Sequence, residues 1–126
     1  MTSQTITKVQ ELMHTTRVED VMATNVIIIS PSMTVSDVKT LMMDQHISGA
    51  PVLAEDRIVG MVTMTDILRA MEQGRLHEPV TEIMTTRVRT VLKESVVAAV
   101  ANTLGLKGAS RLPVVDQAGN LVGIVT

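Results

Sequence analysis

The chain has no cysteine and no phenylalanine, tyrosine or tryptophan among its 126 residues. Without cysteine, the protein has no disulfide framework and no thiolate nucleophile. Without aromatic rings, it lacks the stacking surface that proteins use to bind single-stranded nucleic acids. Its net charge of −2 gives no basic footprint for nucleic acid either. We therefore do not expect nucleic acid as a partner.

Long apolar runs, a secretion signal and a metal-ligand pattern are also missing. The uncharged apolar stretches fall far short of the roughly 20 residues that a membrane-spanning helix requires. The first five residues, MTSQT, lack the basic and then apolar pattern of a secretion signal. The three histidines, His14, His46 and His77, have no ligand spacing. We expect a cytoplasmic protein with no membrane segment and no metal site.

Apolar residues are plentiful: hydrophobic residues make up 45% of the chain, and the mean hydropathy is +0.30. This is enough for a packed core, with ten methionines serving first as adaptable core filler. No catalytic constellation is found, because there is no nucleophile elbow, no phosphate-cradling glycine loop and no recognisable carboxylate pair. We therefore do not expect an enzyme.

The chain contains an internal repeat. The segment VEDVMATNV, from Val18, recurs as VTEIMTTRV from Val80, a shift of 62 residues. The same shift relates SGAPV from Ser48 to SRLPV from Ser110. GMVT and GIVT, from Gly60 and Gly123, are 63 residues apart, which requires one extra residue in the second copy's hairpin turn. A small unit that cannot bury its own apolar face needs its twin. The repeat therefore predicts two units packed about a pseudo-twofold axis.

The first copy predicts alternating strands and helices. A short amphipathic helix is expected at residues 4–13 and a turn at 18–22, followed by a β-branched strand at 26–29. Thr34 and Asp37 form a capping box for a helix that ends near residue 46. Strands at 50–54 and 58–62 form a hairpin, and a helix follows at 63–71 and ends near Gly74.

The second copy predicts the same order up to its last helix. We expect a turn at 80–84, a weaker strand at 88–92, a helix at about 95–106, and a hairpin of strands at 112–115 and 121–125. Thr126 matches Thr63, so the last helix of this copy is missing. The fold class is α/β, with two β-α-β-β-(α) repeats. The predicted organisation is an N-terminal segment (1–16), repeat 1 (17–73), a linker (74–79) and a truncated repeat 2 (80–126).

These motifs resemble the tandem CBS-domain pair, a family named after cystathionine β-synthase. The resemblance covers about residues 17–126. It rests on the acidic-apolar-Met turns DVM and EIM, the strand starts GAPV and RLPV, and the strand ends GMVT and GIVT. In the first copy the strand end continues as TMTDIL, the family's most specific signature.

The resemblance implies a regulatory module that senses an adenosyl ligand, namely AMP, ADP, ATP or S-adenosylmethionine, in a cleft between the repeats. It places Asp66 on the ribose hydroxyls and Thr63 beside the ribose or phosphate. It places the adenine against two segments, comprising Thr24, Asn25 and Val26, and Ser48, Gly49, Ala50 and Pro51. It also implies that the chain forms a homodimer.

The residue chemistry agrees with this role but leaves a plainer one open. An ionised carboxylate accepts strong hydrogen bonds from a diol, and a helix N-terminus favours phosphate. Thr63 and Asp66, however, also form an ordinary capping box that the fold alone could require. Arg87 and Arg111 could reach the phosphates of a nucleotide or could simply belong to a solvated face.

The second copy predicts a weaker site and leaves a rival function open. Its matching residues are Thr86, Val88, Leu112, Pro113 and Thr126, and it has no residue at the position equivalent to Asp66. The missing helix leaves apolar surface that a homodimer partner or the helix at 4–13 would cover. The rival function is a ligand-free structural dimerisation module, either on its own or as a fragment of a larger enzyme or transporter.

Overall fold

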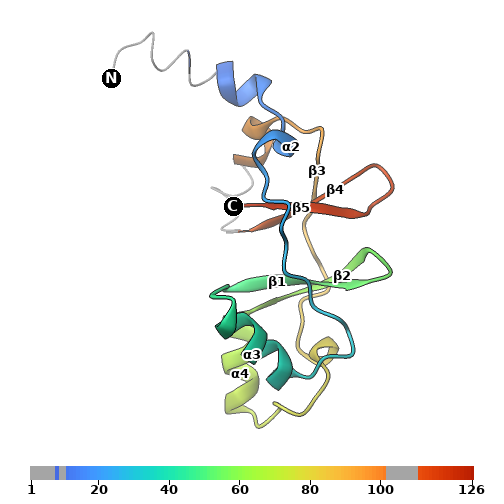
Figure 1. The fold of residues 1–126 in the computed structure, drawn as a ribbon. Coiled ribbons are helices and arrows are strands. Elements are labelled where there is room, and N and C mark those ends of the chain that lie inside the picture. The colour runs from blue at the N-terminus through green and yellow to red at the C-terminus, as the bar shows by residue number, and fades with distance from the viewer. Residues whose placement is uncertain (1–7, 9–10, 102–110) are drawn as a thin grey trace. The chain divides into compact units, whose positions relative to one another are not determined.

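The structure is a computed structural model that describes residue 8, residues 11–101 and residues 111–126. The chain divides into two compact units, shown in Figure 1. Unit 2 is the continuous segment Val26–Val88, and unit 1 combines Met1–Asn25 with Arg89–Thr126. The units do not coincide with the sequence repeats. The opening turn of each repeat belongs to the unit that holds the hairpin of the other repeat.

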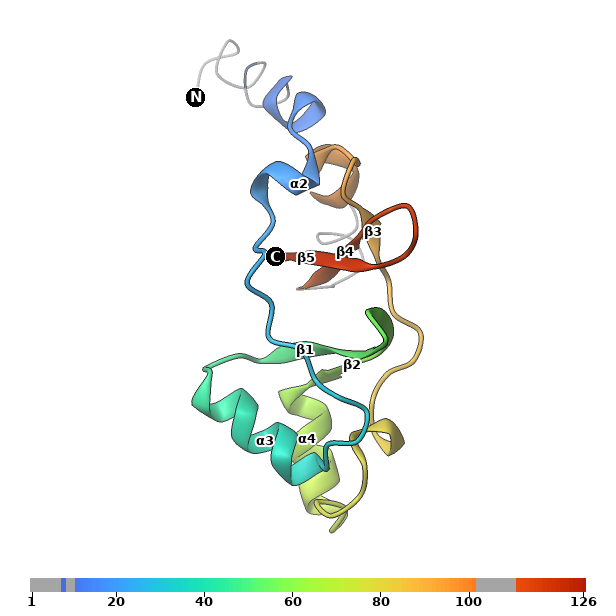
Figure 2. The ribbon, with the colours of Figure 1, turned by 45° about the vertical axis from the view of Figure 1, so that its right-hand side comes forward.

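Unit 2 is a β-hairpin covered by two helices. Strand β1 (Gly49–Ala54) pairs antiparallel with β2 (Arg57–Thr63). Helices α3 (Val35–Asp44) and α4 (Met64–Glu72) lie side by side on one face of this hairpin (Figures 1 and 2). The turn between the strands has left-handed backbone at Glu55 (φ 52°) and Asp56 (φ 67°), which matches the natural twist of a two-residue hairpin. A single-turn 3-10 helix, η1 (Val80–Glu82), completes the unit.

The core of unit 2 lies between the hairpin and the two helices. Helix α3 contributes Val35, Val38 and Met42, whose spacing of three and four residues places them on one face. Helix α4 contributes Ile67 and Ala70, which are also buried. Residues of the hairpin, of η1 and of the preceding segment complete this cluster; they are Ala50, Val52, Val62, Val80 and Ile29.

Both helices of unit 2 begin with the same capping box, as the sequence predicts. In α3 the Asp37 N–H donates to Thr34 Oγ1 at 3.1 Å, and the Thr34 N–H donates to Asp37 Oδ2 at 3.1 Å. In α4 the corresponding distances between Thr63 and Asp66 are 3.3 Å and 2.9 Å. The predicted helix end near Gly74 is also confirmed, because this residue has φ 69° and its N–H donates to the Met71 carbonyl.

Unit 1 contains a three-stranded sheet in the order β3-β4-β5. Strand β3 (Val91–Leu92) is parallel to β4 (Leu112–Val115), which is antiparallel to β5 (Leu121–Val125). The single-turn helix α2 (Val18–Val21) contacts β5, and residues 97–101 are helical. Val18, Val100, Leu112 and Val114 form the buried core. The loop between β4 and β5 is held by Asp116 Oδ1, which accepts from the Ala118 and Asn120 N–H groups at 3.0 and 2.9 Å.

Each unit contains the same contact between a methionine and a glycine. A Cβ added at Gly60 would meet Met84 and, at 3.0 Å, the carbonyl oxygen of Thr85. A Cβ added at Gly123 would meet Met22 and, at 2.9 Å, the carbonyl oxygen of Ala23. The acidic-apolar-Met turn of one repeat is therefore packed on the glycine of the other repeat's second hairpin strand. This explains why both motifs occur in both copies.

The prediction of a regular strand at 26–29 is wrong. Only Ile29 pairs with β1: its N–H donates to the Pro51 carbonyl, and its carbonyl accepts from the Leu53 N–H, both at 2.9 Å. Ile28 is 51% exposed. β-Branched residues favour extended backbone, but a ladder also needs repeated pairing, which this segment makes at one residue. The strand predicted at 88–92 shortens to β3, yet it is the more regular of the two.

Two predicted helices lie partly outside the described residues. Of the helix predicted at 4–13, Lys8 and residues 11–13 are described, and helix continues to residue 15. Of the helix predicted at 95–106, the helical part that the structure describes is 97–101. Within the described residues, no helix has the length and apolarity needed to cross a membrane.

Candidate functional site

The junction between β2 and α4 in unit 2 brings together four of the predicted ligand residues. The strand register places Gly49 opposite Thr63. The N–H of Met64, the first residue of α4, donates to the Ser48 carbonyl at 2.9 Å. Asp66 follows in the first turn of the helix. The fold therefore brings together, at the end of the hairpin where β1 begins and β2 ends, four residues: Ser48, Gly49, Thr63 and Asp66.

The two oxygens of the Asp66 carboxylate have different roles. Oδ2 accepts from both the Thr63 N–H and the Thr63 hydroxyl, each at 2.9 Å. Oδ1 lies 3.7 Å from Arg69 Nη1, which is an ion pair but is longer than a hydrogen bond. The Asp66 side chain is 16% exposed. One oxygen is thus committed to the helix cap, and the other faces a cation and retains hydrogen-bonding capacity.

The other polar groups at this junction are largely used by the fold. The Thr63 hydroxyl donates to Asp66 and accepts from the Asp66 N–H at 3.3 Å. The N–H groups of Met64 and Asp66 are both bonded within the protein. The helix N-terminus is therefore better satisfied than the sequence suggested, and Thr63 acts first as an orienting partner of Asp66.

The residues predicted to contact an adenine differ in burial and in the unit to which they belong. The side chains of Ala50 and Pro51 are fully buried, so these positions present backbone rather than side chain. The Pro51 carbonyl accepts from the Ile29 N–H. Val26 is half-buried and, like Ser48–Pro51, belongs to unit 2, whereas the exposed Thr24 and Asn25 belong to unit 1.

Asp66 also lines a small polar cavity of about 170 Å³ in unit 2. Its other residues include Arg69 and Arg75, which the sequence did not single out. Arg75 Nε donates to Glu78 Oε2 at 2.6 Å, and this hydrogen bond raises the pKa of Arg75 and lowers that of Glu78. The spacing of three residues between Asp66 and Arg69 was a usable signal for the first arginine. No comparable pattern indicates Arg75, which lies beyond the helix end.

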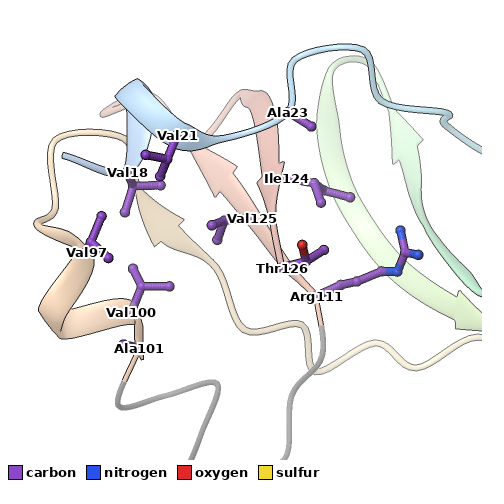
Figure 3. A pocket seen from close by; sticks show the side chains of 10 residues that line it. All are labelled: Val18, Val21, Ala23, Val97, Val100, Ala101, Arg111, Ile124, Val125 and Thr126. Atoms are coloured by element: carbon purple, nitrogen blue, oxygen red, sulfur yellow. The ribbon is translucent and has the colours of Figure 1, made fainter. Parts of the chain in front are cut away.

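The residues of the predicted second site are also divided between unit 1 and unit 2. Thr86, Arg87 and Val88 belong to unit 2, and the first two are exposed. Leu112 and Pro113 are buried in β4, and Thr126 follows β5. The half-buried Arg111 lines, together with Thr126, an apolar cavity of about 500 Å³ within unit 1 (Figure 3). In the described part of the chain, no cluster of histidine and acidic residues could hold a metal ion.

Comparisons with known proteins agree with the repeat. The CBS domain is matched at residues 18–73 and again at 80–126. The chain is 36% identical over 110 residues to the CBS domain-containing protein YhcV of Bacillus subtilis, a match that covers 86% of this chain and 78% of YhcV. It is 34% identical over 112 residues to a homoserine O-acetyltransferase of Methanosphaerula palustris, of which it spans only 22%.

Solved structures share the fold. The CBS domain pair of protein MJ0100, in complex with 5′-methylthioadenosine and S-adenosyl-L-methionine, is 29% identical with a TM-score of 0.78, and the match covers 88% of this chain and 89% of that one. CBSX2 of Arabidopsis thaliana in complex with AMP is 28% identical with a TM-score of 0.79, covering 88% and 90%. These matches confirm the predicted mixed α/β pair.

Proposed function

Because this chain belongs to the CBS domain family as a tandem pair, we propose that it is a regulatory, non-catalytic module that binds an adenosyl ligand. The ligand is an adenine nucleotide or S-adenosylmethionine. Two similar pairs support this class, since one was solved with 5′-methylthioadenosine and S-adenosyl-L-methionine and the other with AMP.

The observation that carries the proposal is the asymmetric use of the Asp66 carboxylate. Its Oδ2 is held by Thr63, which fixes the orientation of the group, while Oδ1 has only the 3.7 Å ion pair with Arg69. In the proposed complex, Oδ1 accepts a charge-assisted hydrogen bond from a ribose hydroxyl. Capping and ligand binding are then compatible, because they use different oxygens.

The remaining contacts of the proposed complex are mostly backbone and apolar ones. The adenine lies against Val26 and the backbone of Ser48–Pro51, with Thr24 and Asn25 contributed by the preceding segment. No aromatic side chain is available for stacking, so the affinity depends on aliphatic contact and on hydrogen bonds. Arg87 and Arg111 are candidate phosphate contacts. The candidate residues of a weaker second site are Thr86, Val88, Leu112, Pro113 and Thr126.

The test is calorimetric titration with AMP, ADP, ATP and S-adenosylmethionine, comparing Asp66→Ala with Asp37→Ala. Both changes remove the acid of a capping box, but Asp37 lies in the first turn of α3 and takes no part in the proposed site. Loss of a charge-assisted hydrogen bond should weaken the best ligand about tenfold to a hundredfold in Asp66→Ala. Asp37→Ala should bind as the wild type does.

A first screen uses the composition of the chain. With no tryptophan or tyrosine, the protein absorbs little at 280 nm, so a co-purified adenine would be conspicuous at 260 nm. Equal affinity in Asp66→Ala and wild type would remove Asp66 from the site. Failure of the wild type to bind any of the four ligands would overturn the proposed function itself.

A second candidate function, structural dimerisation, is favoured by apolar surface on unit 2. Met43 of α3 is 59% exposed, and Leu68 and Met71 of α4 are 54% and 40% exposed. A homodimer that packs these residues would bury them. Sedimentation should then show a dimer that Leu68→Asp dissociates, whereas a wild-type monomer would remove this candidate.

A further inference from the structure

The small polar cavity beside Asp66 is lined by charges of both signs. Its lining includes two acids, Asp66 and Glu82, and two arginines, Arg69 and Arg75. All four lie in unit 2, on α4 or on the segment that follows it. The formal charges of these four side chains cancel, so the effect of the lining on a charged ligand depends on what each arginine already binds.

The charge of Arg75 is used by the fold. Its Nε and Nη2 donate to the two carboxylate oxygens of Glu78 at 2.6 and 3.3 Å. Its Nη1 donates to Gln73 Oε1, and Nη2 also donates to the Glu82 carbonyl, both at 3.3 Å. The guanidinium of Arg75 is therefore matched by the Glu78 carboxylate and held in place by its neighbours.

Arg69 is placed to act on a ligand of Asp66. It lies three residues along α4 from Asp66, so the two side chains share one face of the helix. Its side chain is 63% exposed, and its Nη1 lies 3.7 Å from Asp66 Oδ1. A ligand hydroxyl that donates to Oδ1 at about 2.7 Å would lie within about 6.5 Å of this nitrogen. That separation is shorter than the screening length at physiological salt, about 8 Å.

We infer that Arg69 is a specificity-determining residue of the Asp66 site, where its charge favours nucleotides over S-adenosylmethionine; this inference rests on the proposed function. A nucleotide brings a phosphate of about −2 charge toward a site that already contains the Asp66 and Glu82 carboxylates. Arg69 offsets the resulting repulsion, because like charges raise the free energy of the complex and an opposite charge lowers it. S-adenosylmethionine brings a sulfonium cation instead, which the two carboxylates attract and Arg69 repels.

The test measures how the effect of Arg69→Met depends on the charge of the ligand. The full chain is titrated calorimetrically with adenosine, AMP, ATP and S-adenosylmethionine, without magnesium, which would cancel part of the charge of ATP. Because the arginine is largely exposed, ATP should weaken by about two- to fivefold and AMP by less. The affinity for uncharged adenosine should change little, and that for S-adenosylmethionine should rise. Added salt should reduce the difference between variant and wild type.

Two further variants make the test specific to this position. Arg57→Met removes the same charge at the opposite end of the hairpin from Thr63, and it should bind all four ligands as the wild type does. Arg69→Lys keeps the charge and should keep the wild-type order of affinities. An equal change for all four ligands in Arg69→Met would overturn the inference and leave the proposed function standing, since the arginine would then act on the shape of the site alone. A wild type that binds none of these ligands would overturn the proposed function and the inference together.

Discussion

The two units use the same sequence pattern, but within the described residues the matching positions Ile83 and Val21 differ in burial. In unit 2, Ile83 packs against a core that Ile67 and Ala70 of α4 complete. In unit 1, its counterpart Val21 is 54% exposed beside a cavity of about 500 Å³. Equivalent apolar residues of the repeat can therefore differ in exposure within the described residues.

The two units are alike in one respect. In each unit, the opening turn of one repeat packs on the hairpin of the other repeat, which we call the exchange of opening turns. Met84 contacts Gly60 in unit 2, and Met22 contacts Gly123 in unit 1. The flanking backbones pair too, as Met61 does with Thr85 and Ile124 with Ala23. What the repeats share is therefore the exchange of turns between them.

The largest expected effect comes from truncating a core side chain of unit 2. Ile67→Ala removes a fully buried side chain from the core of unit 2, and it should lower the free energy of unfolding by about 2–5 kcal/mol. Leu68→Ala is the matched control, because Leu68 is the next residue and is 54% exposed. Urea denaturation, at concentrations where both variants have the same oligomeric state, measures the difference. Similar losses in the two variants would contradict the assignment of Ile67 as core.

The next effect tests the feature that the units share. Gly60→Ala and Gly123→Ala each place a methyl group against a methionine and a carbonyl oxygen, so each should cost about 1–3 kcal/mol by overpacking. Gly74→Ala is not a suitable control because of its positive φ, so Ser32→Ala, at an exposed position, serves instead. Thermal unfolding of the three variants measures the costs. A loss confined to one of the two glycines would break the equivalence of the units.

The sequence predicted the elements better than their assembly. Hairpins, capping boxes and the end of α4 depend on local chemistry, such as the Thr-x-x-Asp pattern and Gly74, and these predictions are confirmed. The segment 26–29 has the composition of a strand but pairs only at Ile29, because pairing depends on residues far away in the chain. The exchange of opening turns likewise depends on long-range packing of Met22 and Met84, which no local pattern indicates.

The candidate site shows the same limit. The spacing of Thr63 and Asp66 predicted that they would share a junction, and they do. It could not predict which carboxylate oxygen the cap would use, because this depends on rotamers. Nor did it single out Arg75, whose position near Asp66 results from the packing of the segment after α4. Local periodicity carries no information about such neighbours.

Helix capping provides a smaller contrast between the units. In unit 2, Thr34→Ala removes a side-chain cap of α3 and should cost about 1 kcal/mol. In unit 1, α2 begins after Arg17, whose side chain makes no capping bond, although its N–H donates to Asp20 Oδ2 at 3.2 Å. Arg17→Ser would complete a capping box there and should raise the free energy of unfolding by about 0.5–1 kcal/mol. Chemical denaturation of the two variants measures both changes. A loss on Arg17→Ser would show that the arginine has another role.

The smallest effect concerns acid, because each unit has one carboxyl group whose pKa is lowered for a different reason. In unit 1 the Asn120 and Ala118 N–H groups lower the pKa of Asp116, and in unit 2 the Arg75 guanidinium lowers that of Glu78. A lowered pKa in the folded state contributes stability at pH values above the unfolded pKa, near 4, and this stability disappears as the pH falls through the folded value. Asp116→Asn and Glu78→Gln should each reduce the loss of stability between about pH 5 and pH 2, measured by urea denaturation at each pH.

Added salt distinguishes the two causes of the lowered pKa values. It should weaken the contribution of the partly exposed ion pair of Glu78 and leave that of the backbone-bonded Asp116 nearly unchanged. Equal sensitivity to salt would contradict this division.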